Sequence, residues 1–311
     1  MAYGACVSNQ IAPTPAQRPQ LALLIRLAAA FTLSVMLVLV KKASESGIHL
    51  AEILFWRQLP TVPILLIWFA ATGALQSLKT QRLGKHAQRA LYGLTGMFLN
   101  FGAVTLLPLA EATTFGFTSA IWAVILSALL LKEKVGIYRW GAVLLGFAGV
   151  VVIAQPGDST IPLFAAGVAL AAPFMIALIS IQIRDLTKTE NPMTIVFYFA
   201  AFTAPLLALW LPFVFTDHTP YQWMLLAALA VSGLLGQFLL TAALKYGAVA
   251  SVIVMDYSAL LWATLFGFLF FDRLPTAALW LGAPLIIGAG MIIAWREHSL
   301  SKTKAVPGMP A

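Results

Sequence analysis

Residues 21–40 read LALLIRLAAAFTLSVMLVLV, and the only charged side chain in this run is Arg26. A helix that crosses a lipid bilayer needs about 20 mostly apolar residues, so the run is long enough to span a membrane. Lys41 and Lys42 follow it directly, without the small-residue cleavage site of a signal peptide. The run therefore predicts a retained transmembrane helix.

The composition of the whole chain agrees with a membrane protein. Residues of the types AVILMFWYC make up 61% of the 311 residues, and charged residues make up only 10%. A soluble domain is typically about 45–50% apolar and about 25% charged. Too few charges remain to cover a water-exposed surface, which excludes a soluble enzyme, a fibrous repeat and a disordered chain. The net charge of +8 is then better explained by Lys and Arg in cytoplasmic loops than by nucleic-acid binding.

Ten apolar runs of spanning or near-spanning length follow one another with short connections. We predict spans at roughly 21–41, 51–73, 89–107, 112–131, 139–154, 161–183, 193–215, 222–244, 250–271 and 277–295. The runs lack the alternation of barrel strands, and open sheet edges are not tolerated in lipid, so the predicted fold is all-helical.

The distribution of positive charge predicts the orientation. If the N-terminus is cytoplasmic, fifteen of the 19 Lys and Arg residues fall on the cytoplasmic side. Arg26 is counted there, Lys41, Lys42 and Arg273 fall outside, and Arg57 lies within a span. This bias predicts that both termini are cytoplasmic, in the plasma (inner) membrane.

The two halves of the sequence resemble each other. At an offset of 142, Phe55-Trp56-Arg57 matches Phe197-Tyr198-Phe199 and Lys42 matches Arg184, while Ser119-Ala120 matches Ser258-Ala259 at an offset of 139. Five spans per half is an odd number, so the second half enters the membrane from the opposite side. The expected organisation is a cytoplasmic tail (1–20), a first repeat (21–155), an inverted second repeat (161–295) and a second tail (296–311), an architecture common in transporters.

Several motifs resemble a known family. The run from Leu109 to Thr114, the Ser119-Ala120 pair, the stretch ending Leu131-Lys132-Glu133-Lys134, Trp140-Gly141 with Gly146 and Gly149, and Phe55-Trp56-Arg57 are similar to the EamA module. Two such modules form the ten-span fold of the drug/metabolite transporter superfamily. The second copy departs from the pattern, with Phe199 in place of the arginine and Asp272-Arg273 in place of Glu-Arg. The resemblance implies an exporter of metabolites such as aromatic or other apolar amino acids.

Polar and aromatic residues in the middle of spans are the candidates for a substrate cavity. They lie on the third, fourth, eighth and ninth spans, which are equivalent in the two repeats, and are Asn100, Thr118, Ser119, Trp122, Gln237, Tyr257, Ser258 and Trp262. Aromatic walls with a few amide and hydroxyl groups suit an apolar amphiphile. Interhelical hydrogen bonds and ordinary packing are the alternative roles for each residue.

Three charged residues are further candidates. Arg57 and Asp256 lie inside spans, where a charge should face protein or a wet cavity, but at opposite depths, which argues against a direct pair. Arg57 could instead anchor its helix, and Asp256 could cap a helix N-terminus. Lys42 could attract a carboxylate at the outer mouth. Because Asp256 is the one carboxylate at intramembrane depth, near the inner end, we expect facilitated diffusion rather than proton coupling.

The sequence carries no catalytic motif, no metal-ligand set, no cofactor motif and a single cysteine, Cys6. We therefore expect a secondary transporter that acts on a small-molecule substrate by alternating access, in the lipid bilayer, as a monomer or homodimer, without nucleic acid. Two alternatives stay open: a proton-coupled or exchange transporter of another metabolite, such as a sugar phosphate or nucleotide derivative, and a membrane-embedded transferase.

Overall fold

The structure is a computed structural model that describes residues 19–133, 135–155, 161–246 and 254–305. Its helices are α1 (Pro19–Glu45), α2 (Leu50–Gln58), α3 (Thr61–Ala71), η1 (Leu75–Leu78), α4 (Leu83–Leu106), α5 (Leu109–Gly116), α6 (Ser119–Leu130), α7 (Ile137–Ala154), α8 (Leu163–Leu186), α9 (Pro192–Ala208), α10 (Leu211–Val214), α11 (Pro220–Tyr246), η2 (Val254–Tyr257), α13 (Ser258–Phe271) and α14 (Ala277–Ala305). Described residues form no strand, as the sequence predicts.

Described helices correspond to each of the ten predicted spans, although several consist of two helical pieces, and residues 250–253 of the ninth predicted span lie outside the described residues. Seven helical stretches are long and apolar enough to cross a membrane, and two shorter apolar helices, Pro192–Ala208 and Met255–Phe271, accompany them. With α4 these make ten. The second span is interrupted between α2 and α3 at Pro60, which cannot donate a backbone hydrogen bond. Pro173 and Pro284 lie inside continuous helices instead.

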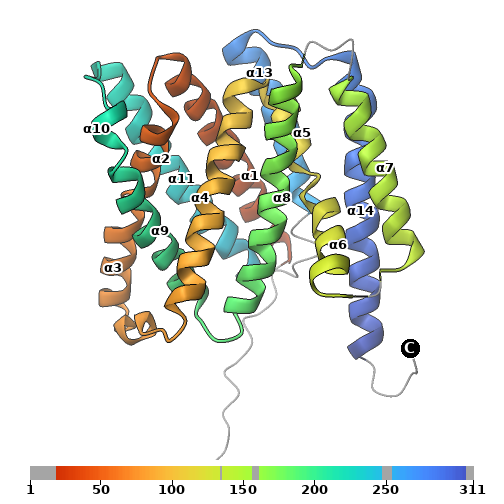
Figure 1. The fold of residues 1–311 in the computed structure, drawn as a ribbon, viewed down its shortest axis with the longest axis horizontal. Helices are drawn as coiled ribbons and strands as arrows, with labels where there is room; N and C mark the ends of the chain where they lie inside the picture. The colour runs from red at the N-terminus through yellow and green to blue at the C-terminus, as the bar shows by residue number, and fades with distance from the viewer. Residues whose placement is uncertain (1–18, 134, 156–160, 247–253, 306–311) are drawn as a thin grey trace, which may run out of the picture.

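The helices stand side by side and pack in pairs that follow the repeat (Figure 1). α1 packs along α11, so the first span contacts the eighth. α4 packs along α8, so the third span contacts the sixth. These two pairs are exchanged by the inverted repeat. The fifth and tenth spans, α7 and α14, pack against each other at one end of the bundle.

Glycines at equivalent positions make equivalent close contacts. A Cβ atom placed on Gly93 of α4 would lie 2.5 Å from Phe199 of α9, and one placed on Gly233 of α11 would lie 3.4 Å from Arg57 of α2. Phe199 and Arg57 are themselves the matched residues of the two repeats. Small residues let helix backbones approach closely in lipid, where hydrophobicity does not drive association.

The same correspondence holds one helical turn away. A Cβ atom on Gly96 would lie 3.4 Å from Met175 of α8, and one on Gly236 would lie 2.6 Å from Leu33 of α1. Leu33 and Met175 are again 142 residues apart. The packing of the two halves therefore obeys the inverted symmetry at the level of single side chains.

Candidate functional site

Arg57 is a cation among apolar and thioether groups. Its Nε atom lies 3.5 Å from the Met36 sulfur, its Nη1 atom lies 3.8 Å from the Met97 sulfur, and its guanidinium lies 5.4 Å from the centre of the Phe101 ring. Its strongest polar contact is the hydrogen bond from Nη1 to Oε1 of Gln58, at 3.2 Å. No described carboxylate forms an ion pair with it. A guanidinium without a carboxylate inside a membrane protein is costly and is typical of a site that receives an anion.

Arg89 is a second guanidinium without a carboxylate partner among the described residues. It lies on α4, where its guanidinium carbon is 4.4 Å from the centre of the Phe199 ring. Its Nε and Nη1 atoms are buried and have no hydrogen-bond partner. Arg89 is one of the fifteen Lys and Arg residues that the charge bias assigns to the cytoplasmic side, and its position in the sequence does not indicate a site. Its burial becomes apparent only once α9 packs against α4.

Asp256 is engaged by Arg26 of α1. The Nε and Nη2 atoms of Arg26 each donate to one carboxylate oxygen of Asp256, both at 2.6 Å, and Nη1 lies 3.5 Å from the carbonyl oxygen of Leu240. The side chain of Arg26 is 11% exposed, so this residue lies within the folded bundle rather than in the cytoplasmic segment to which its charge was assigned. A bidentate pair of this kind satisfies the carboxylate and connects the two repeats.

The two candidate tryptophans occupy separate aromatic clusters. The Trp122 ring meets Phe147 of α7 and Phe174 of α8 edge to face, each at 5.4 Å between ring centres. The Trp262 ring meets Phe31 of α1 edge to face at 5.0 Å. Both indole nitrogens are buried and lack a hydrogen-bond partner in the described part of the chain. Such buried donors are available to a ligand acceptor.

Two of the candidate hydroxyl groups stabilise their own helix ends. Thr118 donates to the carbonyl oxygen of Phe115 at 2.7 Å, and Ser258 donates to that of Met255 at 2.6 Å. These bonds occupy the donors where α6 and α13 begin, which favours the structural role. The Ser119 side chain is half-buried and makes no hydrogen bond with any residue that the structure describes.

The remaining candidates differ in their surroundings. Asn100 is half-buried on α4, and its amide forms no hydrogen bond within the described segments. Gln237 is exposed on α11. The Tyr257 ring packs on Phe117 at 4.9 Å, and Gly290 of α14 leaves room for its hydroxyl, which a Cβ atom there would approach to 2.0 Å.

The lysines at the end of α1 make structural contacts. Lys41 donates to the carbonyl oxygens of Val104 and Leu107 at 3.0 and 2.5 Å, which caps the end of α4. Lys42 lies 4.7 Å from the centre of the Phe271 ring at the end of α13. Neither arrangement needs a ligand.

A Glu–His pair connects α2 with the segment that precedes α11. Oε1 of Glu52, on α2, lies 2.5 Å from Nε2 of His218, which precedes α11, and both side chains are fully enclosed. Trp56 donates to the same oxygen at 3.1 Å. We call this group, Glu52, Trp56 and His218, the outer closure, because the sequence predicts that these residues lie on the outer side.

An equivalent group connects α9 with η1. Thr194 and Tyr198 of α9 donate to the carbonyl oxygens of Ser77 and Leu78 at 2.9 and 2.6 Å. Thr194 and Tyr198 are the repeat equivalents of Glu52 and Trp56. This inner closure therefore uses neutral hydroxyl groups where the outer closure uses an ionisable pair.

His86 lies beside the inner closure, in the first turn of α4. Its ring packs on Tyr198 at 4.5 Å, and its Nε2 atom lies 3.9 Å from Oε1 of Glu190. Burial lowers the pKa of His86, and the nearby Glu190 carboxylate offsets part of that effect while Arg82 adds to it.

Comparison with known proteins identifies the family. A family model described as the EamA-like transporter family matches residues 20–155 and 163–295, which correspond to the two halves of the bundle. The chain belongs to the EamA-like transporter family. It is accordingly a multi-pass membrane transporter of small molecules and not an enzyme, as the sequence predicts.

The relatives are named for different substrates. The chain is 32% identical over 284 residues to the pseudopaline exporter CntI of Pseudomonas aeruginosa, a match that covers 90% of this chain and 96% of that protein. It is 29% identical to a riboflavin transporter of Vibrio cholerae, with 79% and 83% of the two chains covered. It is 26% identical to an S-adenosylmethionine uptake transporter of Rickettsia bellii, with 83% and 88% covered.

A solved crystal structure shares the fold. It aligns with a TM-score of 0.59 and 22% identity, and the match covers 89% of this chain and 98% of the other. At that identity the likeness concerns the arrangement of helices alone.

The predicted site residues thus lie in different surroundings. Arg57 lies beside α1 and α4, whereas Trp122, Trp262 and Asp256 each contact a different neighbour. The sequence did not indicate four further residues of the described polar contacts, which are Arg26, Arg89, Glu52 and His218. Charged residues near predicted span ends were available as a signal, but partners that lie 166 to 230 residues apart cannot be matched from one sequence.

Proposed function

We propose that this protein exports small organic solutes that combine an anionic group with an apolar or aromatic body. Aromatic and other apolar amino acids are the members of this class that the family resemblance favours. The main support for this proposal is Arg57. Its guanidinium lies beside thioether groups and an aromatic ring, and no described carboxylate pairs with it. An anionic group of the substrate would supply the bidentate partner that Arg57 lacks.

The rest of the substrate would contact aromatic and amide groups. Trp122 and Trp262 offer indole donors without partners, and Asn100 offers a free amide within the described residues. Apolar walls with a few polar groups are typical of sites for amphiphilic small molecules. We propose that these residues line the pathway, with alternating access of the two repeats around it.

Export is the direction that best fits the relatives. The relative with 32% identity over most of both chains is named as an exporter, although another relative is named for uptake. We further propose that the protein resides in the plasma (inner) membrane and moves its substrate down its gradient. Asp256 already has a bidentate cationic partner, which removes the reason to assign it a proton-carrying role.

Counterflow in proteoliposomes tests the substrate class. Vesicles loaded with unlabelled phenylalanine should accumulate labelled phenylalanine, and phenylalanine amide, which lacks the carboxylate, should neither exchange nor compete. Arg57→Gln should lower the exchange rate by about tenfold or more, because a charged hydrogen bond contributes about 1.5–3 kcal/mol. Arg57→Lys should retain part of the activity, and Lys132→Gln, at an exposed lysine, should match the wild type. Equal exchange of the acid and the amide would overturn the proposal.

A second candidate is exchange of a phosphorylated metabolite, such as a sugar phosphate or nucleotide derivative. Such a substrate needs more than one cation, and Arg89 provides a second buried guanidinium with unpaired nitrogen atoms. The same counterflow assay with sugar phosphates and nucleotides separates the two candidates. Activity that requires both Arg57 and Arg89 and ignores amino acids would select the second.

A further inference from the structure

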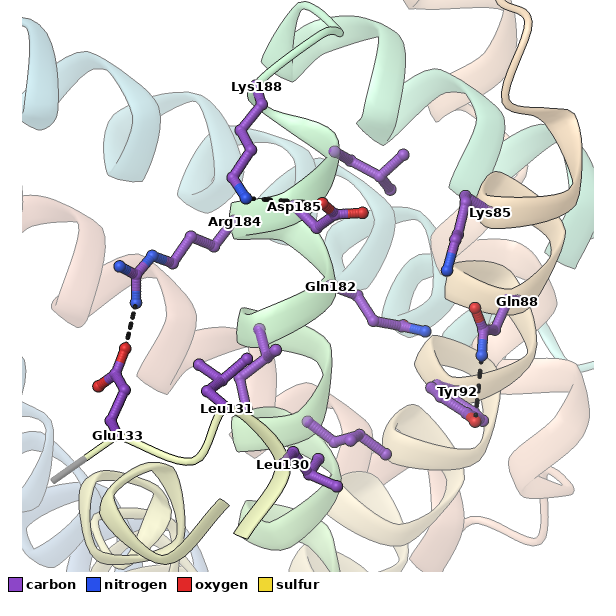
Figure 2. Close-up of a pocket in the computed structure, with 13 residues that line it drawn as sticks. Lys85, Gln88, Tyr92, Leu130, Leu131, Glu133, Gln182, Arg184, Asp185 and Lys188 are labelled. Carbon is purple, nitrogen blue, oxygen red and sulfur yellow. Dashed lines mark hydrogen bonds and ion pairs between the residues drawn. The ribbon is translucent and has the colours of Figure 1, made fainter. Parts of the chain in front are cut away.

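An open groove of about 640 Å³ lies between α4, the end of α6 and the last turns of α8 (Figure 2). Lys85, Gln88 and Tyr92 of α4 face Gln182 of α8 across it. We call it the inner groove, because the sequence predicts that these helix ends lie on the cytoplasmic side. None of the residues proposed for transport lines it.

The charges of the inner groove leave an excess of cations. Arg184 lies 3.8 Å from Glu133, and Asp185 is held by Arg82 through a hydrogen bond and ion pair. Lys188 therefore has only a secondary, 3.7 Å contact with Asp185, and its side chain is 70% exposed.

Lys85 and Gln182 add unused polar groups. The side-chain ammonium of Lys85 forms no hydrogen bond or ion pair within the described segments, and Figure 2 shows it turned towards the groove. Oε1 of Gln182 is buried and has no hydrogen-bond partner among the described residues. These groups suit an anion that also carries hydrogen-bonding groups.

The floor of the groove is apolar. Leu130 and Leu131 are 56% and 41% exposed, and Leu178 and Ile181 of α8 continue the surface from them. A soluble anion would use the lysines and gain nothing from these side chains. An occupant with both a charged head and a hydrocarbon chain uses both, and basic pockets between helices at the cytoplasmic face bind such lipids.

The repeat supplies an internal comparison. A groove of about 540 Å³ between α1 and α11 contains Leu39, Ala228 and Ser232, which are the repeat equivalents of Ile181, Gln88 and Tyr92 of the inner groove. No charged residue lines this second groove. The packing of the helix pair therefore creates the hollow in both halves but does not require charge in it.

We propose that the inner groove binds one anionic phospholipid of the inner leaflet, with its phosphate at Lys85 and Lys188 and an acyl chain along Leu130, Leu131 and Ile181. The lipid would bridge α4 and α8, one helix from each repeat. The site is separate from the proposed substrate pathway.

Lipid retention on the purified protein tests this site. The protein would be exchanged into detergent with equal amounts of phosphatidylglycerol and phosphatidylcholine, and bound lipid counted by native mass spectrometry. We expect preferential retention of one phosphatidylglycerol. Lys85→Gln and Lys188→Gln should each lower its affinity by about fivefold, the effect of one basic residue near an anionic headgroup. Lys79→Gln with Lys132→Gln, at exposed lysines outside the groove, is the matched control and should retain the lipid.

Four results would overturn the proposal. Equal retention of the two lipids would show that the site does not distinguish an anionic headgroup. An equal loss of phosphatidylglycerol in the Lys79→Gln, Lys132→Gln control would show only a diffuse attraction to surface charge. Displacement of the lipid by millimolar inorganic phosphate would show a soluble-anion site instead. A Leu131→Gln variant keeps every cation, so it should weaken the binding of phosphatidylglycerol but not that of phosphate. Unchanged binding of phosphatidylglycerol in this variant would also contradict a lipid as the occupant. Size-exclusion profiles that match the wild type establish that each variant is folded.

Discussion

Arg26 and Asp256, 230 residues apart in the sequence, form a bidentate ion pair with two 2.6 Å hydrogen bonds. Arg26 comes from the first span and Asp256 from the turn before α13 in the second repeat. The pair therefore fixes one repeat to the other, and it neutralises the carboxylate that otherwise had the best position for proton coupling.

Asp256→Asn is accordingly expected to reduce stability without abolishing counterflow. We expect a loss of about 1–2 kcal/mol, below the value for a fully buried pair because the Asp256 side chain is 38% exposed. Thermal unfolding in detergent measures the loss, and counterflow measures transport. Uphill accumulation driven by an imposed pH gradient, present in the wild type and absent in Asp256→Asn, would show instead that Asp256 carries the proton.

The outer closure should be more sensitive to mutation than the inner closure. His218→Ala leaves the fully enclosed Glu52 carboxylate with only the Trp56 donor among the described residues, and we expect a loss of about 3–5 kcal/mol. The double variant Glu52→Gln with His218→Asn should recover much of it, because no buried charge remains. Thr194→Val in the inner closure removes one neutral hydrogen bond and should cost about 1 kcal/mol. Equal losses for His218→Ala and Thr194→Val in thermal unfolding would contradict this assignment.

Gly149 and Gly141, on the same helix α7, should respond differently to alanine. A Cβ atom at Gly149 would lie 2.7 Å from the carbonyl oxygen of Gly282 on α14, whereas one at Gly141 would meet nothing within 4 Å. Gly149→Ala must push the two backbones apart, with an expected loss of about 1–3 kcal/mol. Gly141→Ala should be neutral or stabilise the helix by up to about 1 kcal/mol. Melting temperatures in detergent compare the two, and a loss as large at Gly141 would refute the close-contact explanation.

The orientation can be tested on exposed residues of opposite helix ends. In a Cys6→Ser background, a cysteine at Lys79 should react with a membrane-impermeant maleimide only after the cells are opened, and one at Asp217 should react in intact cells. Both side chains are exposed, so accessibility within the protein does not limit labelling. Labelling of Lys79→Cys in intact cells would reverse the predicted topology.

The sequence by itself determined that the protein lies in a lipid bilayer, how many spans it has and that its two halves are repeats. Apolar runs need about 20 residues to cross lipid, and this local requirement can be read without knowing which helices touch. The matched segments Phe55–Arg57 and Phe197–Phe199 predicted the repeat, and the odd number of spans per half predicted its inversion. The contacts of Gly233 with Arg57 and of Gly93 with Phe199 follow that prediction.

The tertiary structure alone decided which charges have partners. Arg26 and Arg89 look like ordinary cytoplasmic charges in the sequence, yet one is paired with Asp256 and the other is buried against Phe199. The enclosure of Glu52 by His218 also depends on two helices meeting across the repeats. Pairing between residues more than 100 positions apart is set by helix packing, and helix packing in lipid depends on the shapes of small residues rather than on hydrophobic pattern.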